Sequence, residues 1–178
     1  MNKINSERIM GIAFACFCTG LLTYYFSHSE SSAYRIWLKI ITNCVGVITE
    51  LDFSPTENGT AYIALNAPIS IDQSCSGTRF VTISEIVAIH LWFKSDRKSG
   101  WFQSLFRLAL FLVSGLLIAL TANVIRISTA IKFLPLEKHI DFLGTALYHE
   151  IHGITIFVTC LILFSVTSQK LTLKLFGK

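Results

Sequence analysis

The chain has 178 residues, enough for one domain, of which 52% are hydrophobic and 15% are charged. A typical soluble domain has about 25% charged residues, so this composition excludes an ordinary soluble protein. The formal net charge of +4 indicates the orientation of a membrane protein rather than nucleic-acid binding, because the basic residues cluster beside uncharged apolar runs.

Residues 9–26 form the first apolar run, which contains no charge over 18 residues. This length approaches the ~20 residues that cross a bilayer as a helix. Lys3 and Arg8 precede the run, as in a signal peptide, but the apolar stretch continues well past the AFA sequence that could serve as a cleavage site. We therefore expect an uncleaved anchor, with a cleaved signal peptide as the alternative.

The segment after this anchor is not a bare loop. Residues 34–51 are apolar, short and flanked by aromatic residues, which predicts a helix that lies on the membrane surface or re-enters it; a full span is the alternative. The sequence SPTENGT, residues 54–60, predicts a turn. The sequence AYIALNAPISID, residues 61–72, predicts two short strands or one extended, hairpin-like piece.

Three further apolar segments follow. Residues 78–93 form the weakest of them, because they carry Arg79, Glu85 and His90. Residues 108–125 and 151–167 contain no charge and predict two more spans, with a break at Pro135 between them. We expect a single domain over residues 1–178. Its fold class is an all-α integral membrane bundle of about four transmembrane helices, with an interfacial helix and a short extended segment on the outer face.

The charges assign an orientation to this bundle. Basic residues are enriched in cytoplasmic loops. Nine of the 15 basic residues and only two of the 11 acidic residues lie in alternate connecting regions: before the first span, between the second and third, and after the fourth. Both termini are therefore expected in the cytoplasm of a cell with the protein in its inner membrane. The outer segments are then residues 27–76 and 126–148.

This topology brings polar residues from three spans to the outer face. They are Cys75 before the second span, Asn123 and Arg126 at the end of the third, and His149, Glu150 and His152 at the start of the fourth. A thiol is nucleophilic as the thiolate, which a helix N-terminus or a nearby cation favours. An imidazole can accept and return a proton, and a fixed arginine can stabilise an oxyanion. The set predicts a cysteine acyl-transfer site.

Simpler interpretations apply to several of these residues. Arg126 could be an interfacial anchor, and Asn123 could bond across helices. Glu85 is expected to pair with Arg79, Arg126 or another polar partner, because a carboxylate is costly inside a membrane. HEIH lacks the four-residue histidine spacing of zinc proteases, so no metal is expected. A disulfide from Cys75 could reach only Cys44. The other four cysteines lie in apolar runs and are expected to pack there: Cys16, Cys18, Cys44 and Cys160.

Three motifs in order carry a family resemblance. CSG at residues 75–77, NVIR at 123–126 and HEIHGITIF at 149–157 resemble the motifs of the exosortase/archaeosortase family of membrane cysteine transpeptidases. The resemblance covers residues 61–164 and suggests a short, exosortase K-like member, since members commonly have more spans. It implies Cys75 as nucleophile, Arg126 as oxyanion stabiliser and His149 as base and acid. His152, Asn123, Arg79, Glu85 and Ser76 are further candidates at or behind the site.

The resemblance also implies a substrate. Members of that family cleave exported proteins that end in a short motif, often Pro-Glu-Pro, followed by an apolar helix and a basic cluster, and they pass the new carboxyl end to an acceptor. We expect no cofactor; the expected partners are such substrates and membrane lipid, and no nucleic acid. A non-catalytic membrane subunit of an export or polysaccharide assembly system is the alternative. A thiol redox protein is disfavoured, because no CxxC pair accompanies Cys75.

Overall fold

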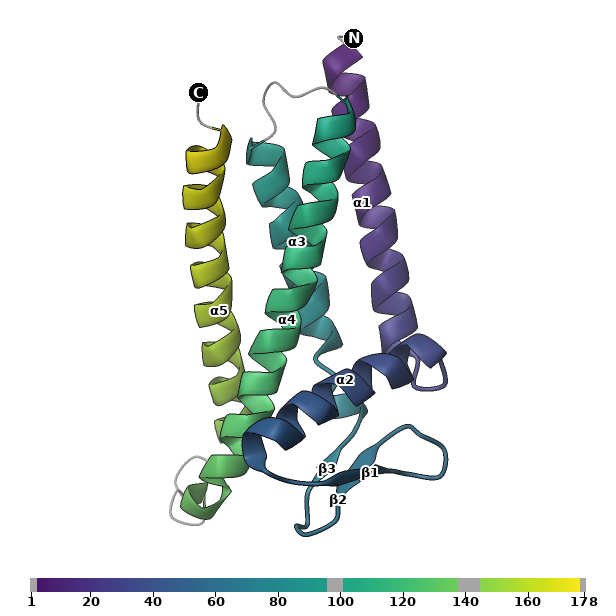
Figure 1. Cartoon of the computed structure of the whole chain (residues 1–178), viewed down its shortest axis with the longest axis vertical. Helices are drawn as coiled ribbons and strands as arrows, with labels where there is room; N and C mark the ends of the chain where they lie inside the picture. Colours follow the sequence, from purple (N-terminus) through teal and green to yellow (C-terminus); the bar gives the residue numbers. More distant parts are fainter. Residues whose placement is uncertain (1–2, 96–100, 138–144, 177–178) are drawn as a thin grey trace.

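The computed structural model describes the backbone at residues 3–95, 101–137 and 145–176, and the side chains at residues 9–94, 102–133 and 150–170. The described elements are, in chain order, α1 (Lys3–Ser27), α2 (Ser32–Thr49), β1 (Phe53–Pro55), β2 (Tyr62–Ala64), β3 (Ser70–Ile71), the 3₁₀ turn η1 (Gln73–Cys75), α3 (Thr78–Ser95), α4 (Trp101–Glu137) and α5 (Thr145–Phe176). Figure 1 shows α1, α3, α4 and α5 running along the long axis, with α2 and the sheet gathered at one end. The start of α1 and the end of α5 lie at the opposite end.

Three of the described helices are long and apolar enough to cross a membrane: Ile9–Ser27, Phe102–Phe133 and Glu150–Lys170. They correspond to the first, third and fourth predicted spans. The predicted second span is also a helix, α3, and runs within the bundle. Its sequence holds Arg79, Glu85 and Lys94, so it does not reach the same apolar composition.

The outward sides of the long helices are strongly apolar. Phe17 of α1 is 63% exposed and Phe102 of α4 is 82% exposed, and they belong to rows of exposed large hydrophobic residues on α1, α4 and α5. Soluble monomers rarely expose contiguous apolar surface of this extent. These faces fit contact with lipid, and the protein is a helical membrane protein.

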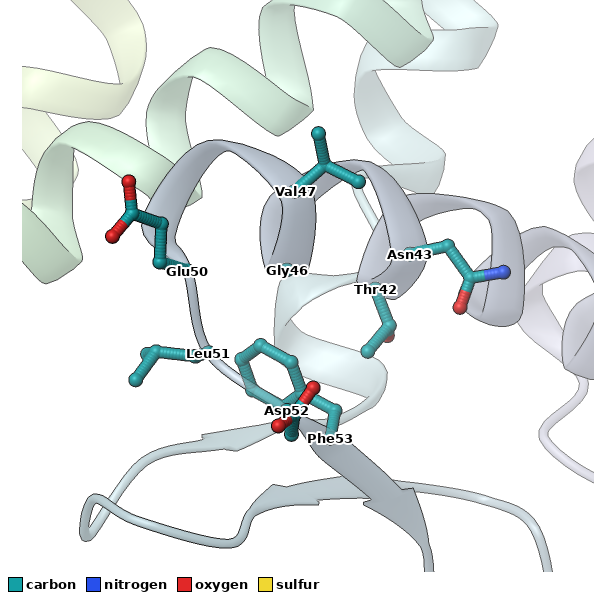
Figure 2. Close-up of a pocket in the computed structure, with 8 residues that line it drawn as sticks. All are labelled: Thr42, Asn43, Gly46, Val47, Glu50, Leu51, Asp52 and Phe53. Atoms are coloured by element: carbon teal, nitrogen blue, oxygen red, sulfur yellow. The ribbon is translucent and has the colours of Figure 1, made fainter.

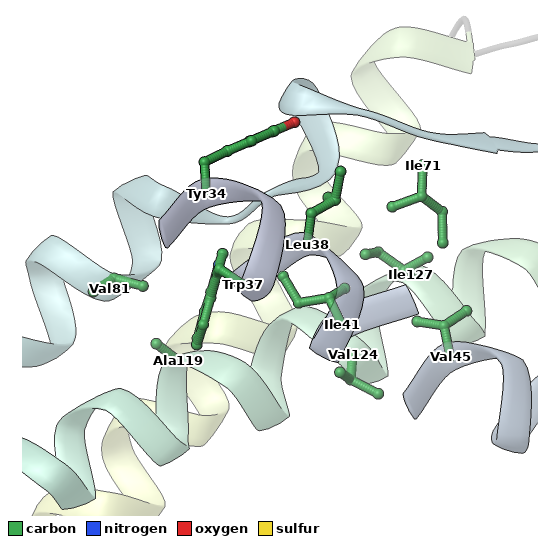
Figure 3. Close-up of a cluster of buried hydrophobic side chains, with 10 residues drawn as sticks. All are labelled: Tyr34, Trp37, Leu38, Ile41, Val45, Ile71, Val81, Ala119, Val124 and Ile127. Carbon is green, nitrogen blue, oxygen red and sulfur yellow. The ribbon is translucent and has the colours of Figure 1, made fainter. Parts of the chain in front are cut away.

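The helix predicted from residues 34–51 is present as α2, which lies across one end of the bundle (Figure 1). Ser31 caps it by accepting the Tyr34 N–H at 3.0 Å. One face of α2 is buried, with residues spaced as on one side of a helix: Tyr34, Trp37, Leu38, Ile41, Thr42 and Val45. Figure 3 shows this face meeting side chains of β3, α3 and α4, namely Ile71, Val81, Ala119, Val124 and Ile127.

The extended segment forms a three-stranded antiparallel sheet in the order β1-β2-β3. The two strands expected after residue 61 are β2 and β3. The strand β1 was not expected, because its three residues include Pro55, and proline usually indicates a turn. Proline is tolerated at a sheet edge, and β1 is an edge strand.

The expected break at Pro135 is wrong. The helix α4 continues through Pro135 and ends at Glu137. A proline removes one backbone hydrogen bond and its ring crowds the carbonyl four residues earlier. Only two residues of α4 follow Pro135, so a kink at this point displaces little of the helix.

The helices α3 and α4 approach each other closely at Gly115. A side chain there would place its Cβ 3.1 Å from the Ser84 carbonyl oxygen and 3.2 Å from the Ala88 Cβ. Ala119 and Ala122 continue this buried strip of α4 towards the end of the bundle that carries the sheet. Small residues at helix interfaces let backbones approach in membranes. The strip ends at Asn123, a candidate site residue.

Candidate active site

A short capped turn holds Cys75 at the end of β3. The Asp72 carboxylate accepts the Ser74 N–H at 2.8 Å and the Ser74 hydroxyl at 2.6 Å. The Cys75 N–H donates to the Asp72 carbonyl at 3.0 Å. Asp72 therefore satisfies three donors of η1 through its side chain and backbone. The turn thus fixes the position of Cys75, whose thiol is half-buried.

The residue after Cys75 is held by the helix that crosses the bundle. Ser76 is 1% exposed and its hydroxyl donates to the Gln73 carbonyl at 2.8 Å. Its carbonyl accepts the Trp37 indole N–H at 2.8 Å, and the Trp37 ring stacks on Phe26 with 5.0 Å between centroids. Ser76 thus contributes to the site by ordering the turn, with its hydroxyl already engaged.

Gly77 and Asn123 form one tightly packed unit. Gly77 has φ +66°, and a Cβ there would lie 2.5 Å from the Asn123 Cγ. Asn123 is fully buried, and its amide nitrogen donates to the Cys75 carbonyl at 2.8 Å. Only glycine adopts this left-handed backbone conformation without strain and also leaves the space that the Asn123 side chain occupies. The interaction ties the turn of Cys75 to α4.

Arg126 lies on α4 one turn beyond Asn123. Its guanidinium carbon is 5.3 Å from the centroid of the Phe80 ring, and Phe80 stacks on Phe157 of α5 at 4.2 Å. A Cβ at Gly153 would lie 3.0 Å from the Arg126 Cδ, so Gly153 leaves room for the arginine between α4 and α5. Phe80, which lies under the guanidinium, and Cys75 pack against the same cluster of buried side chains. The structure therefore places Cys75, Asn123 and Arg126 at the same end of the bundle.

The two histidines are described to different extents. His152 is half-buried and its Nε2 lies 3.2 Å from the Thr129 hydroxyl oxygen of α4. Position 149 belongs to α5, but the side chain of His149 lies outside the described residues. Positions 149 and 153 are four apart and therefore share a face of the helix, which is the face where Gly153 meets Arg126.

The expected partners of Glu85 are not found. Glu85 is 1% exposed, and in the part of the chain with described side chains neither carboxyl oxygen has a hydrogen-bond partner. It faces α4 instead, with one oxygen 3.2 Å from where a Cβ of Gly115 would be. Arg79 is exposed, at the start of α3. Among the described side chains, the expected pairing of Glu85 with Arg79, Arg126 or another polar partner is therefore wrong. Arg79 lies on the exposed side of α3, and the Arg126 guanidinium lies over Phe80.

Two residues that order the turn of Cys75 were not predicted. Asp72 had a recognisable signal, since aspartate two residues before a serine is typical of a side-chain-capped turn. Trp37 had none, because its contact joins residues 39 apart in the chain. Tyr34 is close as well: burial, followed by the charges of Asp72 and Cys75, raises its pKa to about 12. Its hydroxyl therefore remains protonated and donates to the Thr60 carbonyl at 3.0 Å.

A separate cavity of about 470 Å³ lies between the second half of α2 and the start of β1. Figure 2 shows its lining, with two carboxylates and several apolar side chains: Thr42, Asn43, Gly46, Val47, Glu50, Leu51, Asp52 and Phe53. The candidate catalytic residues are not among them. All five cysteines are free, so the alternative of a disulfide between Cys75 and Cys44 does not hold.

Comparison with known protein families identifies the chain. Residues 6–166 match the family model described as transmembrane exosortase (Exosortase_EpsH). The chain belongs to the transmembrane exosortase family. No curated protein and no solved structure matches it. The match to this exosortase model extends beyond the three motifs and includes α1, α2 and the sheet, so the elements that hold the turn are part of the family domain.

Substituting Gly77 tests how the turn is held. Gly77→Ala should lower the free energy of unfolding by about 1–3 kcal/mol or more, because it combines overpacking with left-handed strain. It should also change the rate at which iodoacetamide alkylates Cys75. Thermal unfolding of the detergent-purified protein and the alkylation rate are the measurements.

Two other glycines provide matched controls for this change. Gly59 also has φ +66°, but its nearest neighbour is the Arg35 Cδ at 3.7 Å, so Gly59→Ala carries the backbone strain without the collision. Gly20, inside α1, has no other part of the fold within 4 Å of such a methyl group, so Gly20→Ala should not lower stability. A Gly77→Ala protein that lost no more stability than Gly59→Ala would show that the Asn123 contact is unimportant.

Proposed function

We propose that this exosortase is a cysteine transpeptidase that cleaves the C-terminal sorting signals of exported proteins. Its nucleophile is Cys75. The observation that carries the proposal is that the ordered Cys75 turn is bonded to Asn123 and that Phe80, packed against the same cluster as Cys75, lies under the Arg126 guanidinium. The expected substrates end in a short motif, an apolar helix and a basic cluster. Family membership supports this class of substrate.

The reaction follows from the roles of these groups. The Cys75 thiolate attacks the carbonyl carbon of the scissile peptide bond, and Arg126 stabilises the oxyanion of the tetrahedral intermediate. Protonated His149 gives its proton to the departing amine, and a thioester to Cys75 remains. Neutral His149 then removes a proton from an incoming amine or water, which attacks the thioester and releases the thiolate.

Arg126 is well placed for its role by the residues around it. Its stem is confined by Gly153, and its guanidinium lies against the face of Phe80. Stacking on an aromatic ring and a half-buried setting limit the motion of the planar group. A preorganised cation stabilises developing negative charge without rearrangement in the transition state.

We further propose that α1, α3, α4 and α5 all span the membrane, with α2 at the outer interface. The start of α1 and the end of α5 lie at the same end of the bundle (Figure 1). This arrangement and the basic residues near that end support a cytoplasmic location for both termini. On this topology the Cys75 turn lies at the outer surface of the inner membrane. Substrates anchored by their own helix would reach it there.

Labelling from outside the cell tests this orientation. Glu57→Cys, in the exposed turn after β1, should react with a membrane-impermeant maleimide in intact cells when the native cysteines are replaced. Lys94→Cys, near the end of α3, should react only after the cells are opened. The reverse pattern would invert the topology and move the site to the cytoplasm.

Replacing the nucleophile tests the chemistry. An exported reporter ending in a Pro-Glu-Pro motif, an apolar helix of about 20 residues and an arginine cluster serves as substrate. Cys75→Ala and Cys75→Ser should abolish its cleavage while the enzyme still accumulates in the membrane. Replacing the other four cysteines with alanine should preserve cleavage. Cleavage by Cys75→Ala would instead support a non-catalytic subunit acting beside another protease.

The oxyanion and proton-transfer roles are separable with the same reporter. Arg126→Lys keeps the charge but loses the planar fork, and should reduce the rate by about 10²–10³.

His149→Ala should lose cleavage and slow the alkylation of Cys75 near neutral pH, whereas His152→Ala should retain activity because His152 contacts Thr129. The opposite ranking of the histidines would make His152 the general base.

A further inference from the structure

The two edges of the small sheet differ in a way that bears on the substrate. Hydrogen bonds alternate along an antiparallel pair, so every second residue turns its N–H and C=O towards the partner strand. On β1, the flanking bonds Leu65 N–H to Asp52 carbonyl and Thr56 N–H to Ala61 carbonyl place the even-numbered residues towards β2. Phe53 and Pro55 therefore face outward.

The outer edge of β1 is closed to further pairing by its sequence. Pro55 stands at an outward position of this edge and has no N–H to donate. Proline on an edge strand is a common device that prevents another strand from adding. The exposed, charged side chain of Glu57 in the turn after β1 adds to this protection against pairing. The sheet is protected on the side away from Cys75.

The edge of β3 is open. The Ala64 N–H donates to the Ile69 carbonyl at 2.9 Å, and Tyr62 pairs with Ile71. Ser70 lies between these two pairs and is opposite Ile63. By the same alternation, its N–H and C=O point away from β2. Ser70 is exposed, and within the described part of the chain none of the hydrogen bonds outside the sheet involves it.

This open edge runs directly into the nucleophile. Asp72 continues the extended conformation with φ −126° and ψ −162°, so its N–H points away from β2, as that of Ser70 does. Its carbonyl is already used by the Cys75 N–H. The free groups are thus the N–H and C=O of Ser70 and the N–H of Asp72, at the residues that precede the Cys75 turn.

We propose that the exposed edge of β3 binds the segment of the substrate around the scissile bond as an added β-strand. This inference rests on the proposed function and specifies how that site takes its substrate. An extended peptide gains affinity from main-chain hydrogen bonds in this mode of recognition. Ser70 supplies one donor and one acceptor, Asp72 supplies a second donor, and the peptide is led to the thiol of Cys75.

The direction of the added strand follows from the path of the chain. From β3 through η1 into α3, the chain passes from the sheet into the helical bundle (Figure 1). A substrate whose apolar helix follows its cleavage segment and stands beside the bundle takes the same course. The added strand therefore runs parallel to β3.

Ser70→Pro removes the outward N–H and tests this binding mode. Proline is tolerated at an edge position whose N–H faces away from the sheet, so the fold should persist and iodoacetamide should alkylate Cys75 at an unchanged rate. Cleavage of the reporter at limiting concentration should fall about tenfold, the effect expected from losing roughly 1.4 kcal/mol of hydrogen bonding. Ser70→Ala, which keeps the N–H, should cleave faster than Ser70→Pro, because the group that matters is the main-chain N–H and not the hydroxyl.

Cross-linking provides a second readout that does not depend on turnover. In a Cys75→Ala protein without other cysteines, Ser70→Cys should form a disulfide with a reporter carrying one cysteine in its motif, since facing residues of paired strands are close. Glu57→Cys, beside the protected edge, should not. Normal cleavage by Ser70→Pro, or cross-linking at residue 57 instead of 70, would overturn the inference and leave the proposed function intact. A reporter that the unsubstituted enzyme fails to cleave would reject both.

Discussion

The hydrogen bond from the Asn123 amide to the Cys75 carbonyl is the interaction on which the site depends. It joins a turn at the end of the sheet to the longest described helix, and it exists only because Gly77 leaves space for the amide. An unpaired polar group in such a buried place costs about 1–3 kcal/mol. The same bond therefore fixes Cys75 in position and discourages any other arrangement of the turn.

The helix α2 completes this arrangement from the other side. Its indole at Trp37 holds the Ser76 carbonyl, while Tyr34 is anchored on the loop between β1 and β2 through Thr60. The turn of Cys75 is thus fixed between two helices that differ in direction, one along the bundle and one across it (Figure 1). Two carbonyls, those of Cys75 and Ser76, accept these side-chain donors, and the Cys75 sulfur lies 3.7 Å from the Ser74 hydroxyl oxygen.

The sequence predicted the long helices well, because an uncharged run of membrane-spanning length is a local and unambiguous signal. It also placed Cys75, Asn123 and Arg126 at the same end of the bundle, where the structure has them, since consecutive antiparallel helices bring alternate ends together. Local signals failed where a feature depended on position in the fold. Pro55 lies in a strand because that strand is at an edge, and Pro135 is helical because the helix is about to end.

The contacts that order the site were less predictable than its members. Trp37 and Ser76 are far apart in the sequence, and no periodic pattern connects them. The environment of Glu85 was also misjudged: a charge in an apolar segment suggests an ionic partner, yet the described carboxyl faces Gly115. The high cost of a charge inside a membrane identifies Glu85 as an unusual residue, but it gives no information about which helix face Glu85 meets.

The polar content of α3 has a consequence for how the protein enters the membrane. A charged residue at the centre of an inserted helix costs roughly 2.5–3.5 kcal/mol, and α3 brings Glu85 to a fully buried position. The surface that shelters Glu85 belongs to α4, which a ribosome synthesises later. On the proposed four-span topology α3 is therefore poorly stable in lipid until α4 arrives, and the two helices are best regarded as a hairpin that inserts together. The small residues Gly115, Ala119 and Ala122 then serve biogenesis as well as packing.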